Sequence, residues 1–204
     1  MRKSFYKKIK NNGFTLVEMM VAVAVFSLVM VVAMSALINV IDANLKAQAL
    51  KTAINNVNFA LEGISKDMRM GSDYACGTPD SIVSISAPND CTNGGKAIKY
   101  KSPKAVSGGY AYYYYDNNEG QKNIKSCIQK INLTECSNSS NFTAITSNEV
   151  DITNMTFYVI GAKIEPASKT QPRVVITLSG EAGTKDKIKT EFDLQTSVSQ
   201  RTRK

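Results

Sequence analysis

The sequence predicts an α+β protein in which one long N-terminal α-helix packs on an antiparallel β-sheet head. Three observations point to this class: an apolar segment near the N-terminus, an apolar stripe at helical spacing directly after it, and a series of short β-branched or alternating runs in the rest of the chain. They divide the 204 residues into a basic leader at 1–13, an apolar helix segment at 14–41, an amphipathic continuation at 42–70 and a β-rich exported head at 71–204.

Residues 14–41 are long and apolar enough to cross a membrane. These 28 residues carry one charge, Glu18, and at about 1.5 Å rise per residue they exceed the roughly 30 Å hydrocarbon core of a bilayer. A secretory signal peptide would have a shorter apolar core with a small-residue cleavage site after it. The preceding leader holds five positive residues, Arg2, Lys3, Lys7, Lys8 and Lys10. Positive flanks stay in the cytoplasm, so we expect the N-terminus inside and the head outside.

Glu18 needs a partner or a path to water, because a carboxylate inside an apolar helix costs about 2.5–3.5 kcal/mol on insertion scales. The leader ends in Gly13, and Phe14 follows. A cut between these two residues would create a positive amine on Phe14, four residues before Glu18. The carboxylate then has three possible partners: the amine of another subunit, the amine of its own chain at helical i to i+4 distance, or water at the headgroup level.

This junction resembles that of the type IV pilin and type II secretion pseudopilin superfamily. Precursors of that superfamily carry a short Lys/Arg-rich leader, Gly at the cut, Phe next and a Glu four residues beyond, as Gly13, Phe14 and Glu18 do here. The resemblance implies a pilin-like fold, cleavage by prepilin peptidase between Gly13 and Phe14, and N-methylation of Phe14. It also implies that Glu18 neutralises the N-terminal amine of a neighbouring subunit during assembly.

The function implied is that of a structural subunit. The precursor would be stored in the cytoplasmic membrane and joined with other pilin or pseudopilin subunits, through assembly platform proteins, into a type IV pilus or a type II secretion or competence-type filament at the cell surface or in the periplasm. Many filament pilins have a proline within the apolar segment, whereas Ser35 stands there and no proline precedes Pro79. That departure favours a minor subunit. Residues 58–70 and 193–199 are similar to J-type pseudopilins and W-type minor pilins.

An alternative is a membrane-anchored extracytoplasmic binding protein for adhesion or DNA uptake, whose helix is only a tether. Residues 1–13 hold five of the positive charges, so removing them lowers the formal net charge from +8 to +3. The basic tail at 201–204 could contact DNA phosphates, but no patterned basic and aromatic stripe accompanies it. DNA is therefore the less favoured partner.

The helix is expected to continue beyond the membrane, from Phe14 to Met70. An apolar stripe recurs at alternating spacings of three and four, and Gly71 is a plausible stop. The stripe is shorter than three heptads, which favours packing on a sheet over a coiled coil. Its members are Leu50, Ile54, Val57, Leu61, Ile64 and Met68.

The head is expected to contain seven strands joined by turn-rich links. The clearest links are 116–120 and 180–183, where Asn, Asp and Gly tolerate the positive φ that tight connections need. In the run 110–115, alternation places Tyr112 and Tyr114 on one face and Tyr113 and Tyr115 on the other, with one face in the core and the other stacking across strands. The predicted strands are 81–86, 97–101, 110–115, 124–131, 150–160, 173–179 and 187–199.

All four cysteines, Cys76, Cys91, Cys127 and Cys136, follow the apolar segment, which fits export to an oxidising compartment. They allow three pairings. Local bonds, Cys76 with Cys91 and Cys127 with Cys136, are expected because each would order a Gly/Asn/Ser-rich stretch with few apolar residues. Zinc is the competing interpretation, but the chain has no Cys-x-x-Cys pair and no histidine, so no metal or cofactor is expected.

No enzymatic activity is expected. The absence of histidine removes Ser-His-Asp, Cys-His and His-rich metal chemistry. The pairs Glu149/Asp151 and Glu191/Asp193 alternate along predicted strands. A paired-carboxylate glycosidase would need two such groups facing each other across a cleft, whereas carboxylates on an exposed strand face are usually solvated.

Overall fold

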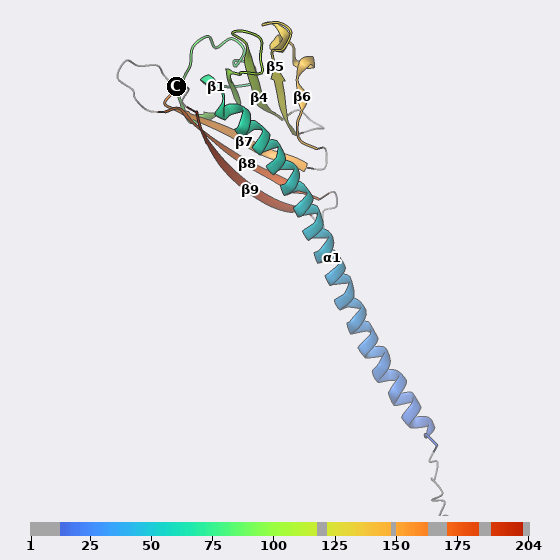
Figure 1. The fold of residues 1–204 in the computed structure, drawn as a ribbon. Coiled ribbons are helices and arrows are strands. Elements are labelled where there is room, and N and C mark those ends of the chain that lie inside the picture. Colours follow the sequence, from blue (N-terminus) through green and yellow to red (C-terminus); the bar gives the residue numbers. More distant parts are fainter. Residues whose placement is uncertain (1–12, 118–121, 148–149, 163–170, 184–188, 202–204) are drawn as a thin grey trace, which may run out of the picture. The chain divides into compact units, whose positions relative to one another are not determined.

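The computed structural model describes residues 13–117, 122–147, 150–162, 171–183 and 189–201 (Figure 1). The chain divides into two compact units, residues 1–44 and 45–204. Helix α1 (Leu16–Arg69) begins in the first unit and ends in the second. The predicted class is confirmed, because the structure has one long N-terminal helix and a set of antiparallel strands.

In the first unit, the described residues expose almost all of their side chains. Leu16 is 75% exposed and Val31 is 71% exposed, values typical of a helix surface without a partner in its own chain. Among the described residues, α1 is the one helix long and apolar enough to cross a membrane. The predicted apolar segment is therefore helical and leaves its apolar surface uncovered.

In the second unit, the same helix buries one side. Ala53, Val57, Leu61, Ile64 and Met68 are all at most 5% exposed. Leu50 packs against this cluster from a half-buried position. The predicted stripe is thus confirmed at Leu50, Val57, Leu61, Ile64 and Met68 as the face that packs on the head. Ile54 is only half-buried and lies outside the core cluster, which contains Ala53 instead.

Helix α1 ends at Arg69, one residue before the predicted end. Gly71 follows the helix as predicted, but a glycine is needed there because a side chain would not fit, rather than because φ is positive. The φ of Gly71 is not positive. A Cβ at this position would lie 2.3 Å from Cδ2 of Tyr100, so the ring occupies the space that a side chain would need. The Tyr74 hydroxyl completes the stop by donating hydrogen bonds to the carbonyls of Met68 (2.5 Å) and Gly71 (3.1 Å).

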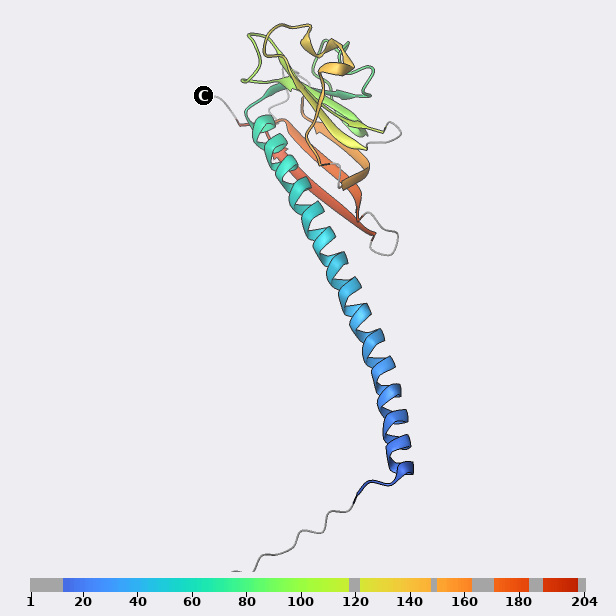
Figure 2. The same ribbon diagram turned by 90° about the vertical axis from the view of Figure 1, so that its right-hand side faces the viewer.

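The strands form two antiparallel sheets rather than one. The five-stranded sheet has the order β1-β3-β4-β5-β6, and the four-stranded sheet has the order β2-β7-β8-β9. The long strands β7, β8 and β9, orange to red in Figures 1 and 2, lie side by side over most of their length. The bounds are β1 Ser72–Gly77, β2 Cys91–Gly95, β3 Ala97–Lys101, β4 Tyr110–Asp116, β5 Asn123–Ile128, β6 Thr143–Ala144, β7 Val150–Ile160, β8 Arg173–Ala182 and β9 Thr190–Ser199.

One main core joins the two sheets and the second part of α1. Tyr113 and Ile124 enter it from the five-stranded sheet, Phe157 and Ile176 from the four-stranded sheet, and Val57 from the helix. Alternate residues of β8 are buried, which is the pattern of a sheet with one face in the core. Each sheet is therefore held by burial of one face against the other sheet and the helix.

A second, smaller cluster covers the outer face of the five-stranded sheet. It contains Tyr112, Ile82 and the disulfide-bonded Cys127 and Cys136, with Tyr114 packed against it from a half-buried position. Tyr113 and Tyr115 belong to the main core instead. The predicted division of the tyrosine run between two faces is confirmed.

Two disulfide bonds close the loops around this outer face. Cys76 is bonded to Cys91 and Cys127 to Cys136, which is the local one of the three possible pairings. The first bond joins the end of β1 to the start of β2, and the second joins β5 to the 3₁₀ turn η1 (Glu135–Ser137). The segments that these two bonds close, 77–90 and 128–135, are rich in polar residues.

One predicted strand was wrong, and three observed strands were missing from the prediction. Residues 81–86 form turns rather than a strand, because the amides of Ser81 and Ser84 bond back to carbonyls three residues earlier. Strands β1, β2 and β6 were not predicted, since their sequences have low β-propensity and the first two are brought together by the disulfide bond.

The predicted link at 180–183 begins too early, since Gly180 lies inside β8. A Cβ on Gly180 would lie 2.6 Å from Cζ of Phe192, so this glycine makes room for a ring of β9. Gly183, with φ of 108°, does have the turn conformation. Within the other predicted link, β4 ends at Asp116 and residues 118–121 lie outside the described residues.

Replacing Gly71 with Ala should lower the stability of the head by about 1–3 kcal/mol, because the new methyl group overlaps the buried Tyr100 ring. Thermal unfolding followed by circular dichroism measures the change. Gly63 is the matched control: it also lies in α1, and a Cβ there meets nothing within 4 Å, so Gly63→Ala should leave stability unchanged or raise it by up to about 1 kcal/mol. Equal shifts for the two variants would contradict this account of the helix end.

Candidate functional site

The junction predicted from the sequence lies just before α1. Gly13, Phe14 and Thr15 have no helical structure, and all three are exposed. The Phe14 ring is 82% exposed. The Gly13–Phe14 bond therefore lies outside the helix and is exposed to solvent or to a partner.

Thr15 and Glu18 form a capping box at the first turn of the helix. The Thr15 amide and hydroxyl each donate a hydrogen bond to Oε2 of Glu18, both at 3.0 Å. In return, the Glu18 amide donates to the Thr15 hydroxyl oxygen at 3.3 Å. The two side chains thus satisfy amide groups that a helix start leaves without partners, and they fix the start of α1 after Phe14.

Thr15 was not among the residues singled out from the sequence. The signal was present, since Ser or Thr followed three residues later by Glu before an apolar run is the pattern of a capping box. The partners expected for Glu18 were an amine or water, and neither of these points to Thr15. In the structure, the first partner of the Glu18 carboxylate is Thr15 of its own chain.

Residues 8–34 match a family model described as the prokaryotic N-terminal methylation motif. The match includes Gly13, Phe14, Thr15 and Glu18 and continues into the apolar part of α1. It supports a type IV pilin-like family, whose members are structural proteins rather than enzymes, and a precursor of the kind that prepilin peptidase processes. The apolar helix and the motif together fit a membrane-anchored precursor.

The head has no counterpart in these comparisons. No curated protein and no solved structure matches the chain. The similarity to known proteins is thus confined to residues 8–34 and does not extend to the head.

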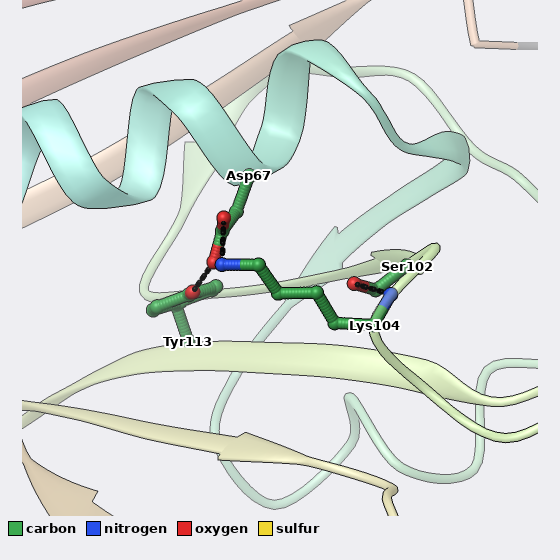
Figure 3. A network of polar contacts seen from close by, with 4 residues as sticks. All are labelled: Asp67, Ser102, Lys104 and Tyr113. Atoms are coloured by element: carbon green, nitrogen blue, oxygen red, sulfur yellow. Dashed lines mark hydrogen bonds and ion pairs between the residues drawn. The ribbon is translucent and has the colours of Figure 1, made fainter.

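One polar network in the head connects α1 to the five-stranded sheet (Figure 3). The Asp67 carboxylate forms an ion pair with Lys104 and accepts a 3.4 Å hydrogen bond from the Tyr113 hydroxyl. Burial and the nearby Asp67 charge raise the pKa of Tyr113 to about 12, so the hydroxyl stays protonated and available as a donor at neutral pH. Ser102 fixes the loop by accepting a hydrogen bond from the Lys104 amide at 3.2 Å. This network is a structural tie between the helix and the sheet.

The other sequence candidates are spread over the head. Asp151, Glu191 and Asp193 are exposed on the four-stranded sheet, whereas Glu149 lies outside the described residues. Asp151 and Glu191 both lie opposite Glu181, on the two strands that flank β8. In the described part of the chain, no group of three or more acidic or cysteine side chains is arranged to hold a metal ion.

The basic tail is described only at its start. The Arg201 amide donates a hydrogen bond to the carbonyl of Arg69 at 2.8 Å, which places the chain end beside the end of α1. Residues 202–204 lie outside the described residues. The less favoured possibility, contact between the tail and DNA, depends on these residues.

Replacing Thr15 with Ala should cost the first turn of α1 about 1 kcal/mol, because the N-cap hydroxyl and its two hydrogen bonds are lost, while the backbone amide at position 15 can still donate to Glu18. Hydrogen exchange of residues 16–19, measured by mass spectrometry on the full chain in lipid nanodiscs, should accelerate about fivefold. Thr15→Ser keeps the oxygen and should exchange like the unchanged protein. The same exchange rate in Thr15→Ala would show that the capping box does not hold this turn.

Proposed function

We propose that this chain is a minor pilin or pseudopilin, cut by prepilin peptidase between Gly13 and Phe14, N-methylated on Phe14 and then assembled into a filament. The observation that carries the proposal is the methylation motif seated on an exposed, non-helical junction directly before a capped apolar helix. The helix remains with the mature chain, because the cut lies on its N-terminal side.

The uncovered apolar surface of residues 14–41 supports assembly as the function. Leu16, Val31 and their neighbours have no partner in the described part of this chain. Lipid would cover them in the precursor, which we propose spans the cytoplasmic membrane with its N-terminus inside. In a filament, the same surfaces would pack against the helices of other subunits. Moving from lipid to protein contacts requires no change in the fold of the head.

Glu18 would serve both states. Before cleavage its carboxylate accepts hydrogen bonds from Thr15. Cleavage adds a cationic amine to the N-terminus, and a charged partner is worth more than a neutral donor in an apolar surrounding. We propose that Glu18 then pairs with the Phe14 amine of a neighbouring subunit, which would set the register of the two helices.

A minor subunit is favoured over the bulk filament protein because α1 continues through the apolar segment without proline and the head is large, with nine strands among the described residues. The proposed partners are prepilin peptidase, other pilin or pseudopilin subunits, the assembly platform and the membrane. The alternative, a tethered binding protein for adhesion or DNA uptake, would need the same helix but neither cleavage nor Glu18.

Mass spectrometry of the mature N-terminus tests the processing step. Protein purified from its native cells, or from a host that also expresses a prepilin peptidase, should begin at methylated Phe14. The matched control is Gly13→Val, which should keep residues 1–13 because the added side chain obstructs the cut site. Recovery of the full leader in the unchanged protein would rule out the pilin pathway and favour the tethered alternative.

Exchanging Glu18 for Gln separates its two proposed roles. Gln at the third helical position still completes a capping box, so cleavage and the first turn should be preserved. The charge partner for the amine is lost, and incorporation into sheared filaments, measured by immunoblot, should fall at least about tenfold. Thr15→Ala, which weakens the cap but keeps the charge, should assemble better than Glu18→Gln. The reverse order of the two variants would assign Glu18 to the cap alone.

A further inference from the structure

A cleft opens on the outer face of the five-stranded sheet, between the two disulfide-closed loops. Its volume is about 870 Å³, within the range of small-molecule and oligosaccharide sites. One wall comes from the segment after β1 and the other from the 3₁₀ turn η1, with the end of β4 between them. The side chains that matter for its chemistry are Asp80, Lys96, Tyr114, Asn117, Asn138 and Phe142.

Two aromatic rings line the cleft. Tyr114 and Phe142 are both half-buried, their centroids are 4.9 Å apart, and their planes meet at 69°. Both rings line the cleft and are only partly buried, so part of each ring is accessible to a ligand. Aromatic faces are electron-rich, so they attract C–H groups that carry partial positive charge, as those of a sugar ring do.

Polar side chains without partners surround these rings. Asp80 and Asn138 are exposed and make no side-chain hydrogen bond or ion pair with any other described residue. The Asn117 Oδ1 accepts a 3.2 Å hydrogen bond from the Tyr115 hydroxyl, which leaves its NH₂ group available. Carboxylate and amide groups offer acceptors and donors in one plane, which suits adjacent hydroxyl groups on a ligand.

The walls are fixed before any ligand arrives. Asn89 holds the first loop by accepting a hydrogen bond from the Cys76 amide (2.9 Å) and donating one to the Cys76 carbonyl (3.1 Å), beside the Cys76–Cys91 bond. In the second loop, Glu135 accepts hydrogen bonds from the amides of Lys130 (2.7 Å) and Ile131 (2.9 Å), next to the bonded Cys136. A preformed cleft binds without the cost of ordering loops.

The charges around the cleft nearly cancel. Lys96 directs its amine to Asn154 and Thr156, and Asp116 is paired with Lys125. A nucleic acid would require an excess of cations, and the described residues that line the cleft provide no such excess. A wholly apolar ligand would leave the carboxylate and amides unsatisfied. A neutral ligand with many hydroxyl groups would place its C–H groups against the rings and form hydrogen bonds with the polar side chains of the walls.

We propose that this cleft binds a neutral saccharide, with sugar C–H groups against Tyr114 and Phe142 and hydroxyl groups bonded to Asp80, Asn117 and Asn138. The proposal concerns the head alone and stands whether or not the N-terminus is processed as proposed above. It would give a filament subunit a means of contacting a glycan-covered surface.

The test applies the full chain, in lipid nanodiscs, to an array of neutral oligosaccharides that includes lactose, maltotriose and chitotriose. Maltoside and glucoside detergents are left out, because their headgroups are sugars. The dissociation constant of the strongest binder is then measured by biolayer interferometry. We expect at least one saccharide to bind with a dissociation constant below about 1 mM. Asp80→Ala and Asn138→Ala, both at exposed positions without a side-chain partner among the described residues, should each weaken binding about tenfold.

Asp193→Asn is the matched control, because it changes an exposed carboxylate on β9 of the other sheet and should bind like the unchanged protein. Reduction of the disulfide bonds should weaken binding as well, since it frees both walls. The proposal is overturned if no saccharide on the array binds, if Asp80→Ala and Asn138→Ala bind as tightly as the control, or if duplex DNA is the one ligand that binds.

Discussion

The uncovered apolar surface of residues 14–41 is the constraint on which the rest of the molecule depends. At about 25 cal/mol per Å² of apolar surface, a helix whose side chains are mostly more than half exposed is unfavourable in water by many kcal/mol. It needs lipid or other helices around it. In the function proposed above, the positive leader, the capped start and a cut between Gly13 and Phe14 would place this surface in a membrane and keep it in the mature chain.

The two parts of α1 show how one helix meets two environments. Beyond Leu45 the apolar residues narrow to one stripe, Val57, Leu61, Ile64 and Met68, which the head buries. Before Asn44 they surround the helix on all sides, so no single partner within the chain would be able to cover them. The apolar residues surround the helix where its surface is uncovered and form a single stripe where the head buries it. The backbone is helical in both parts.

The helix and the long strands were predictable because their signals are local and periodic. The stripe of α1 and the runs that became β4, β7 and β8 all show the spacing of the element they form. Strands β1 and β2 were not predictable, since their order comes from pairing with distant strands and from the Cys76–Cys91 bond. At the N-terminus, the sequence pattern pointed to Gly13, Phe14 and Glu18 as candidates, and the Thr15-x-x-Glu18 spacing carried a capping-box signal that the hydrogen bonds of the first turn bear out.

The disulfide bonds explain how the outer face of the five-stranded sheet remains ordered. Its second cluster is small, with Tyr112 and Ile82 as its main apolar members besides the bonded cysteines. Polar loops over such a cluster bury too little apolar surface to offset their conformational entropy. Each bond removes part of that entropy from the unfolded chain, worth about 2–4 kcal/mol. With the bonds in place, the loops stay ordered without burying much apolar surface. Their exposed positions can therefore hold polar residues such as Asp80 and Asn138, which face solvent or a ligand.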